Sequence, residues 1–448
     1  METLSGFLNL NEMPCPFLFE NNYLYIYCKN GEAKSYLDKT LSHEGGVKKP
    51  IPNRLEGQSN NNKSIVFYID GVGYEYSADM MCMNVTLKAN VLKYVLRTKK
   101  SNLKQISLNI QSQLYKRILG ISTHSKISNE DRLKKVEINI SGKYECLETN
   151  FKYKEQNVKI VSYASITTGS SFKYIPTFYI EFEKKINKEE LFNFIETFID
   201  LLKFLHMRNN IYPELIKYSD GEDEWEIRYI LSPDYFVEEA KEWGFFNIGC
   251  IEWYSIIDNF QCIFDDFLNK NIYLYYLDNK EKDRLWINPV KIFYYSAFFE
   301  NTFSLVYGNK IIHSNKSQKI IDEITDLLEK SKNNHNNSYK DTCDYLIKQL
   351  DHQTLLTKIE KSLKDNDLLL AKSKRIFNLI SKYSNKKIAE KISQIRNFID
   401  HGDREAEINI EIAQCFTLFL LLTYSMLLKR WNINPELISE QLYNLHQI

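Results

Sequence analysis

The sequence predicts an α+β multidomain protein, with a β-rich, sandwich-like N-terminal region followed by an all-α helical bundle. Three observations favour this class. Aromatic and β-branched runs separated by Gly and Asn turns dominate residues 1–185. Beyond Pro289, apolar residues recur at helical spacing. With 448 residues, 44% of them hydrophobic and 26% charged, the chain can bury more than one core.

The N-terminal domain, residues 1–185, is expected to be an antiparallel β sandwich with a sensor or regulatory role. One polar segment rich in Gly, Pro and Asn, His43–Lys63, is interpreted as a loop. The expected strands are Phe17–Asn30, Ser64–Ser77, Met80–Leu92, Lys135–Ile140, Val158–Ala164 and Tyr174–Phe182.

A mixed connecting region is expected at residues 186–288. It begins with a helix at Lys188–Met207, where apolar residues take up a 3.6-residue period. A strand is expected at Glu224–Leu231, and Asp234–Asn269 is predicted to be mostly helical.

Residues 289–448 are predicted to form a helical bundle, because amphipathic segments alternate there with short polar breaks. Gly308 is typical of a helix end. The expected helices are Val290–Tyr307, Ser317–Lys330, Tyr339–Leu350, Leu368–Tyr383, Lys386–Asp400 and Glu405–Leu428. The segment Ile412–Leu428 is apolar enough to raise the question of a membrane span. Because it is short and interrupted by Thr, Ser and Gln, we expect it to be buried in the bundle, with no membrane partner.

Charge and cysteine usage exclude several classes of function. The chain has 58 basic and 58 acidic residues, so a surface for nucleic acid must be local. Its eight cysteines are scattered singly without a C-x-x-C pair, so neither a zinc site nor another metal or cofactor is expected. Reduced thiols, together with no recognisable signal peptide at the N-terminus, predict a cytoplasmic protein.

The most informative segment is Lys391–Gln414, which contains Arg396, Asn397 and His401. An Arg followed by a His after four to six residues also arises by chance, and Arg117 with His124 is such a case. The helical context distinguishes the first pair: Asn397 and His401 are four residues apart and share a helix face. Gly402 is a suitable helix stop, which places His401 at a C-terminal end where the helix dipole favours its protonated form.

Positive charge is concentrated beside this motif. Between Ala371 and Arg404 the sequence has nine basic and three acidic residues. Lys387, Lys391 and Arg404 are the candidate RNA-binding side chains, since a basic strip attracts a phosphate backbone. A solvated helix face is the alternative interpretation.

The motif R-N-F-I-D-H resembles that of the HEPN family, whose helical bundles carry an Arg, four to six residues and a His, with a polar residue after the Arg. Glu300 is the best match to an acidic residue that the family places on an early helix. The order of domains is similar to that of ApeA-type anti-phage proteins. The opening SGFLNL, Glu56–Gly57 and Asn84–Leu87 add to this resemblance.

The resemblance implies an abortive-infection endoribonuclease that cuts RNA, such as tRNA, without a metal and in response to a phage-derived trigger. Arg396, Asn397, His401 and Glu300 would form its catalytic site, shared between the chains of a homodimer or a higher homo-oligomer. His401 would act as acid or base, and Arg396 would bind the phosphate.

Two other functions remain open. The first is a HEPN-like bundle that binds RNA or a partner without cutting, and the second is the HEPN toxin of a toxin–antitoxin pair. Residue by residue, His401 could be an ordinary helix-capping histidine, Arg396 could form a surface ion pair, and Glu300 could simply face water.

Overall fold

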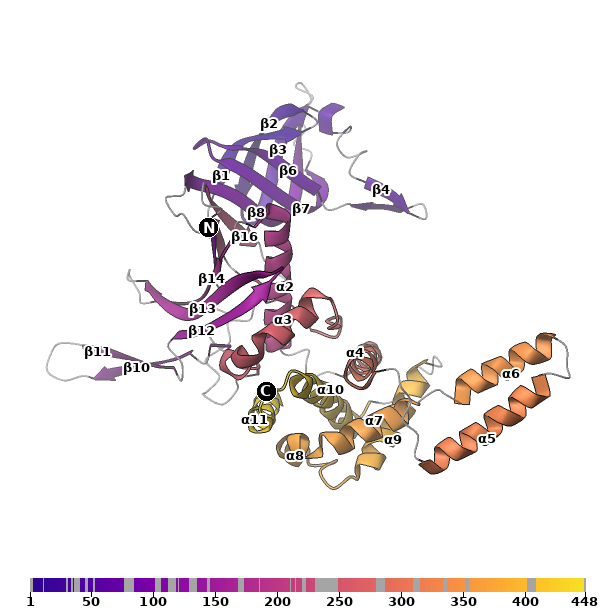
Figure 1. Cartoon of the computed structure of the whole chain (residues 1–448). Helices are drawn as coiled ribbons and strands as arrows, with labels where there is room; N and C mark the ends of the chain where they lie inside the picture. The colour runs from indigo at the N-terminus through magenta and orange to yellow at the C-terminus, as the bar shows by residue number, and fades with distance from the viewer. Residues whose placement is uncertain are drawn as a thin grey trace. The chain divides into compact units, whose positions relative to one another are not determined.

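The computed structural model confirms the predicted class, a β-rich N-terminal part followed by a helical C-terminal part (Figure 1). The described residues are 3–10, 12–29, 31–33, 35, 41–44, 47–50, 53–75, 84–100, 106–111, 118–119, 121–128, 135–142, 146–167, 173–184, 186–209, 211–213, 215–219, 223–229, 249–278, 287–308, 315–332, 337–350, 354–400 and 408–446. The chain divides into two compact units. Unit 1 comprises residues 1–265 and 277–281, and unit 2 comprises residues 266–276 and 282–448.

Unit 1 contains a 12-stranded antiparallel sheet among the described residues. Its strands, in spatial order, are β12 (Cys146–Tyr153), β13 (Gln156–Thr167), β14 (Lys173–Phe182), β9 (Ile106–Gln111), β15 (Leu215–Ser219), β16 (Asp223–Tyr229), β8 (Asn84–Lys100), β3 (Tyr23–Lys29), β2 (Met13–Glu20), β1 (Leu4–Leu10), β6 (Asn53–Ser59) and β7 (Ser64–Glu75). Two separate hairpins pair β4 (Leu41–Glu44) with β5 (Val47–Pro50) and β10 (Ile121–Ser128) with β11 (Lys135–Gly142).

The sheet closes on itself because β7 pairs with β8. The strands β8, β3, β2, β1, β6 and β7 therefore form a barrel, and the sandwich-like region is one continuous sheet. The remaining strands, β12, β13, β14, β9, β15 and β16, form the open half of the sheet. The long strand β8 belongs to the barrel and also borders this open half. Its first half pairs with β3, and its second half pairs along the same edge with β16.

Alternating side chains fill the barrel, as the period of two in a strand requires. Large apolar residues such as Phe17, Phe67 and Tyr94 point inward and are buried. Strands β1 and β6 lie unusually close together. A Cβ atom on Gly6 would lie 2.0 Å from the carbonyl oxygen of Gln58, and one on Gly57 would lie 2.1 Å from that of Phe7. Both strands therefore need glycine at these positions.

The open half of the sheet packs against helix α2 (Lys188–His206). Asn187 caps this helix by accepting a hydrogen bond from the backbone N–H of Glu190, and Met207 ends it in the left-handed conformation. Aromatic rings from sheet and helix form the core: Phe178 contacts Phe198 with ring centroids 5.3 Å apart. Two 3₁₀ turns (Trp253–Ser255 and Ile257–Asn259) lead into α3 (Phe260–Leu268), within which unit 2 begins.

Unit 2 is a helical bundle. Its described helices are α4 (Pro289–Tyr307), α5 (Asn315–Lys332), α6 (Asn337–Leu350), α7 (Leu355–Asp365), α8 (Asp367–Ile376), α9 (Asn385–Asp400), α10 (Ile410–Arg430) and α11 (Pro435–His446). The central helix is α10, which packs against α4, α7, α8, α9 and α11. Helices α5 and α6 pack against each other as a hairpin.

By length and composition α10 could cross a membrane, since an 18-residue window within it has a mean hydropathy of 1.6. In the fold, 72% of that window is buried, as expected for the core helix of a bundle. Its polar groups are satisfied internally: the hydroxyl of Tyr424 lies 2.6 Å from that of Tyr276, and Thr423 donates to the carbonyl of Phe419.

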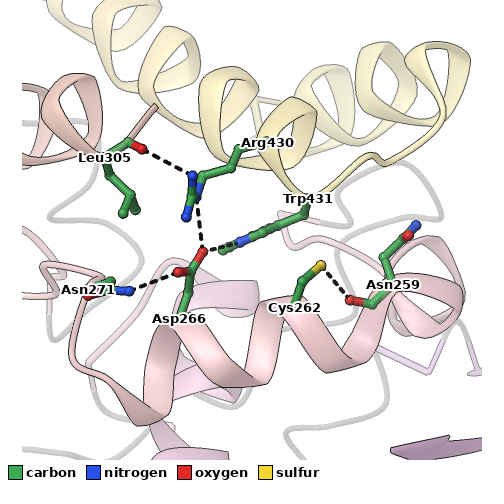
Figure 2. Close-up of polar contacts among 7 residues, drawn as sticks. All are labelled: Asn259, Cys262, Asp266, Asn271, Leu305, Arg430 and Trp431. Atoms are coloured by element: carbon green, nitrogen blue, oxygen red, sulfur yellow. Dashed lines mark hydrogen bonds and ion pairs between the residues drawn. The ribbon is translucent and has the colours of Figure 1, made fainter. Parts of the chain in front are cut away.

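A buried carboxylate ties the end of α10 to the end of α3 (Figure 2). The Oδ2 atom of Asp266 accepts hydrogen bonds from Nε1 of Trp431 at 2.8 Å and from Nε of Arg430 at 3.3 Å. The other carboxylate oxygen accepts from Asn271 at 2.9 Å. Figure 2 also shows Cys262, whose thiol donates to the carbonyl oxygen of Asn259.

Most expected helices and strands are present, with several corrections. The single strand expected at Phe17–Asn30 is instead the end of β2 and all of β3, separated by a turn at Asn21 and Asn22. The segment His43–Lys63 was wrongly predicted to be a loop, because it contains β4, β5 and β6. The helix expected at Leu368–Tyr383 ends at Ile376, and α10 begins at Ile410 instead of Glu405. Two amphipathic helices, α7 and α11, were not predicted. The first part of Asp234–Asn269, up to residue 248, lies outside the described residues, and the described part is mostly helical from Trp253 to Leu268.

Candidate functional site

The predicted motif lies in the last turns of α9. Ser384 precedes this helix and caps it, because its hydroxyl accepts a hydrogen bond from the backbone N–H of Lys387 at 3.2 Å. Asn385 links its first turn to α8: it donates to Asp367 at 3.1 Å and accepts from Lys374 at 3.2 Å. These contacts set the direction of the helix that carries Arg396.

Arg396 continues the core-facing stripe of α9. Ile388 and Ile392 are completely buried and stand four residues apart, and Arg396 follows after four more. The side chain is half-buried, and its Nε atom is shielded from solvent. Shielding part of a charged guanidinium from water costs free energy, so Arg396 differs from an ordinary arginine on the surface.

Asn397 and Phe398 face outward at the end of α9. Asn397 is exposed, and Phe398 is 52% exposed although it is a large apolar residue. His401 and Arg404 lie outside the described residues. The structure therefore describes Arg396 and Asn397 of the motif and leaves their geometry relative to His401 as a prediction.

Glu300 lies on α4, one of the helices that pack against α9. Its neighbours on the inner side of α4, Phe299 and Phe303, are buried, and Glu300 itself is half-buried. The carboxylate is therefore neither in the core nor fully in water. Glu300 and Arg396 stand on two helices that contact each other.

The two described basic candidates gather around Tyr383. The Nζ atom of Lys387 lies 3.7 Å from the ring centroid of Tyr383, a cation–π contact. The Nζ atom of Lys391 lies 5.9 Å from the same centroid and 2.9 Å from Oε1 of Glu411. Lys391 is thus an ion-paired residue that links α9 to the first turn of α10.

Electrostatics at this contact follow from the ion pair. The hydrogen bond from Lys391 lowers the pKa of the Glu411 carboxyl, and Glu411 in turn raises the pKa of Lys391. A hydrogen bond to the same carboxylate raises the pKa of Tyr383. Tyr383 and Glu411 were missed by the sequence reasoning. The available signal for Glu411 was its place in the first turn of α10, where the helix dipole stabilises a negative charge.

The remaining described cations of the basic strip form a solvent-facing set. Lys372, Arg375 and Lys382 are exposed on or after α8. Lys386 lies 3.9 Å from Glu390 on the exposed side of α9. Phosphate oxygens could reach this set without unfolding any element.

Within the described ranges, no three His, Cys, Asp or Glu side chains gather where they could hold a metal ion. Comparison of the chain with protein-family models, with curated proteins and with solved structures finds no match. The function of the candidate site is therefore inferred from the chemistry of its own residues.

Proposed function

We propose that the protein is a metal-independent endoribonuclease of the HEPN type, which cleaves RNA during anti-phage defence. The observation that supports this most is the position of Arg396, an arginine on the core-facing stripe of α9 with a shielded Nε atom, directly before the exposed Asn397. A partly desolvated guanidinium of this kind is suited to binding a phosphate group and stabilising its charge.

The chemistry uses the RNA's own nucleophile. His401 accepts the proton of a 2′-hydroxyl or donates one to the leaving 5′-oxygen, a role for which its ordinary pKa suits neutral pH. Arg396 stabilises the charge that develops on the phosphate. Asn397 orients the imidazole or the phosphate, and Glu300 orients Arg396 from α4. The upstream product is then a 2′,3′-cyclic phosphate.

The assembly is a homodimer or a higher homo-oligomer. One chain supplies one Arg and one His, so two α9 helices facing each other would double the catalytic set. Phe398, beside Asn397, is 52% exposed and would be covered in such a contact. The basic strip would bind RNA, with tRNA as the substrate class, and unit 1 would sense a phage-derived trigger in the cytoplasm.

A single experiment tests the activity. The full-length protein is incubated with total cellular RNA in the presence of EDTA, and the cut ends are mapped. We expect cleavage with 2′,3′-cyclic phosphate ends, and loss of cleavage in His401→Ala with an unchanged circular dichroism spectrum. A Lys330→Ala variant, altered at an exposed cation on α5 outside the basic strip, is the control and should cut RNA normally.

Other results would contradict the proposal. RNA ends carrying 3′-hydroxyl groups would exclude attack by the 2′-hydroxyl. Tight RNA binding without cleavage, in a protein purified with its trigger, would instead favour a non-catalytic RNA-binding bundle.

A further inference from the structure

Four side chains form a row across the outer face of neighbouring strands in unit 1. The register pairs Arg54 of β6 with Tyr68 of β7, Tyr68 with Lys93 of β8, and Lys93 with Tyr229 of β16. The chain neighbours Leu55 and Phe67 point into the barrel, so these side chains point outward. Cations and aromatic rings thus alternate along the row.

The rings of this row already hold one ammonium group. Nζ of Lys93 lies 5.2 Å from the ring centroid of Tyr68, 5.3 Å from that of Tyr229 and 5.8 Å from that of Phe192 on α2. These are cation–π distances. Burial lowers the pKa of Lys93, and the charge of Glu196 opposes this effect. The rings are therefore arranged to accept a cation.

A cavity of about 520 Å³ lies beside the row, between the sheet and α2. The sheet contributes Arg54 and Tyr68. The helix contributes four residues from one face, since their spacing is i, i+3, i+4 and i+7; they are Glu189, Phe192, Asn193 and Glu196. Its size is within the range of small-molecule sites.

The charge of the walls selects for a cation. Glu189 and Glu196 are exposed carboxylates on the helix side of the cavity. Arg54 is the single cation among the described residues that line the cavity, and it forms an ion pair with Glu56. An anionic ligand would meet two carboxylates and an arginine that is already neutralised. A cationic ligand meets both carboxylates and the faces of two rings.

The spacing of the carboxylates indicates two cationic groups. Glu189 and Glu196 are seven residues apart, which is about 10 Å along a helix. An ammonium group beside one carboxylate therefore leaves the other carboxylate available to a second ammonium group. Phe192 lies between them in the sequence, so an aliphatic chain joining two ammonium groups would pass over apolar ring surface.

We propose that this cavity binds a linear aliphatic polyamine, with one ammonium group at Glu189 and Asn193, the methylene chain over Phe192 and Tyr68, and a second ammonium group toward Glu196. The site is independent of the proposed nuclease site, because every residue that forms it belongs to unit 1. The two ends are unequal. Glu196 already acts on the Lys93 ammonium, whereas Glu189 lies seven residues earlier on the same face of α2.

Isothermal titration of the full-length protein with spermidine tests the proposal, with butylamine as the single-cation comparison. We expect saturable binding of one spermidine per chain, and affinity for butylamine lower by about tenfold or more, because one charge-assisted contact is lost. Glu189→Gln should weaken spermidine binding by about tenfold, and Glu196→Gln by a smaller factor. Phe192→Leu should also weaken it, by about threefold, since the cation–π contribution disappears while apolar volume stays.

The matched control is Glu155→Gln, which removes an exposed carboxylate from the β12–β13 turn of the same unit. This variant should bind spermidine like the unaltered protein. Thermal unfolding shows whether each variant is folded before it is titrated. Equal affinity of Glu189→Gln and Glu155→Gln would overturn the proposal, as would the absence of saturable binding. Binding of a lysine-rich peptide at this site in preference to spermidine would also overturn it.

Discussion

The indole Nε1–H of Trp431 donates a 2.8 Å hydrogen bond to the carboxylate of Asp266, and both side chains are buried. Trp431 follows the last residue of α10, and Asp266 lies near the end of α3. A buried carboxylate needs such donors, since charge without partners is strongly disfavoured in the interior. The core of unit 2 therefore depends on a polar contact between residues 165 positions apart.

Trp431→Phe should lower the free energy of unfolding of unit 2 by about 1–3 kcal/mol, because it leaves a buried acceptor one donor short. Urea denaturation followed by circular dichroism measures the change. Arg430→Lys is the control: its side chain is 35% exposed, so this substitution should cost less than about 1 kcal/mol. Equal effects of the two substitutions would contradict the importance of the indole contact.

Gly57→Ala should destabilise the barrel by about 3 kcal/mol or more, because the new Cβ atom would overlap backbone atoms of β1. The matched control is Gly31→Ala, where nothing lies within 4 Å of the added atom. Thermal unfolding of the two variants provides the comparison. A Gly57→Ala protein as stable as the Gly31→Ala protein would contradict the close approach of the β1 and β6 backbones at Gly57.

Mixing Arg396→Ala chains with His401→Ala chains should restore part of the RNA cleavage that each variant lacks alone. This expectation follows from a site shared by two α9 helices, since a mixed dimer keeps one intact Arg and one intact His facing each other. Activity is measured after the two proteins are unfolded together and refolded, or after co-expression. Full activity of a strictly monomeric protein would argue against a shared site.

The cysteines should differ sharply in their reaction with iodoacetamide. Burial raises the pKa of Cys28 to about 12 and that of Cys415 to about 11. At pH 8 only about one Cys28 thiol in ten thousand is then ionised, and the thiolate is the reactive form. Cys146 and Cys262 are exposed and should be labelled first. Peptide mass spectrometry after brief native labelling checks the order, and fast labelling of Cys28 would contradict its burial.

Glu411→Gln should strengthen RNA binding, because it frees Lys391 from its ion pair. The dependence of log affinity on log salt should steepen by about one, the amount expected for one added phosphate contact. Acid should act in the same direction. The lowered pKa of Glu411 keeps the ion pair intact above the ordinary carboxyl range, and the pair is lost only as the pH falls through that lowered value. Glu436→Gln, which removes an exposed carboxylate from the first turn of α11, is the control. An unchanged salt dependence in Glu411→Gln would exclude Lys391 from the RNA surface.

The helices of unit 2 could be predicted well where apolar period and stop signals agree. In α4, for example, Asn288 caps the start and Gly308 ends the helix. The same reasoning failed for Leu368–Tyr383, where Phe377 and Ile380 are buried in a turn and so mimic a helical period. The β4–β6 region was misread because glycine and asparagine usually indicate loops. Gly57, however, is required inside a strand by the close approach of β1.

Within the candidate site, sequence spacing placed Arg396 and Asn397 on one helix but could not show which of them faces the core. That depends on α4, α7 and α10, the helices that pack against α9. The ion pair of Lys391 with Glu411 was equally invisible, because its partners are 20 residues apart and meet only through the packing of α9 on α10.

The strand β8 determines the order in which unit 1 can mature on the ribosome. Its first half needs β3, some 60 residues earlier, whereas the adjoining half needs β16, which is synthesised about 130 residues later. Pairings across such separations fold slowly, since loop closure precedes any stabilising contact. A nascent chain that has completed the barrel therefore still presents the second half of β8 as an open edge, a surface prone to pair with other strands. Until residue 229 has been added, nothing in the described part of the chain can occupy that edge in the native register.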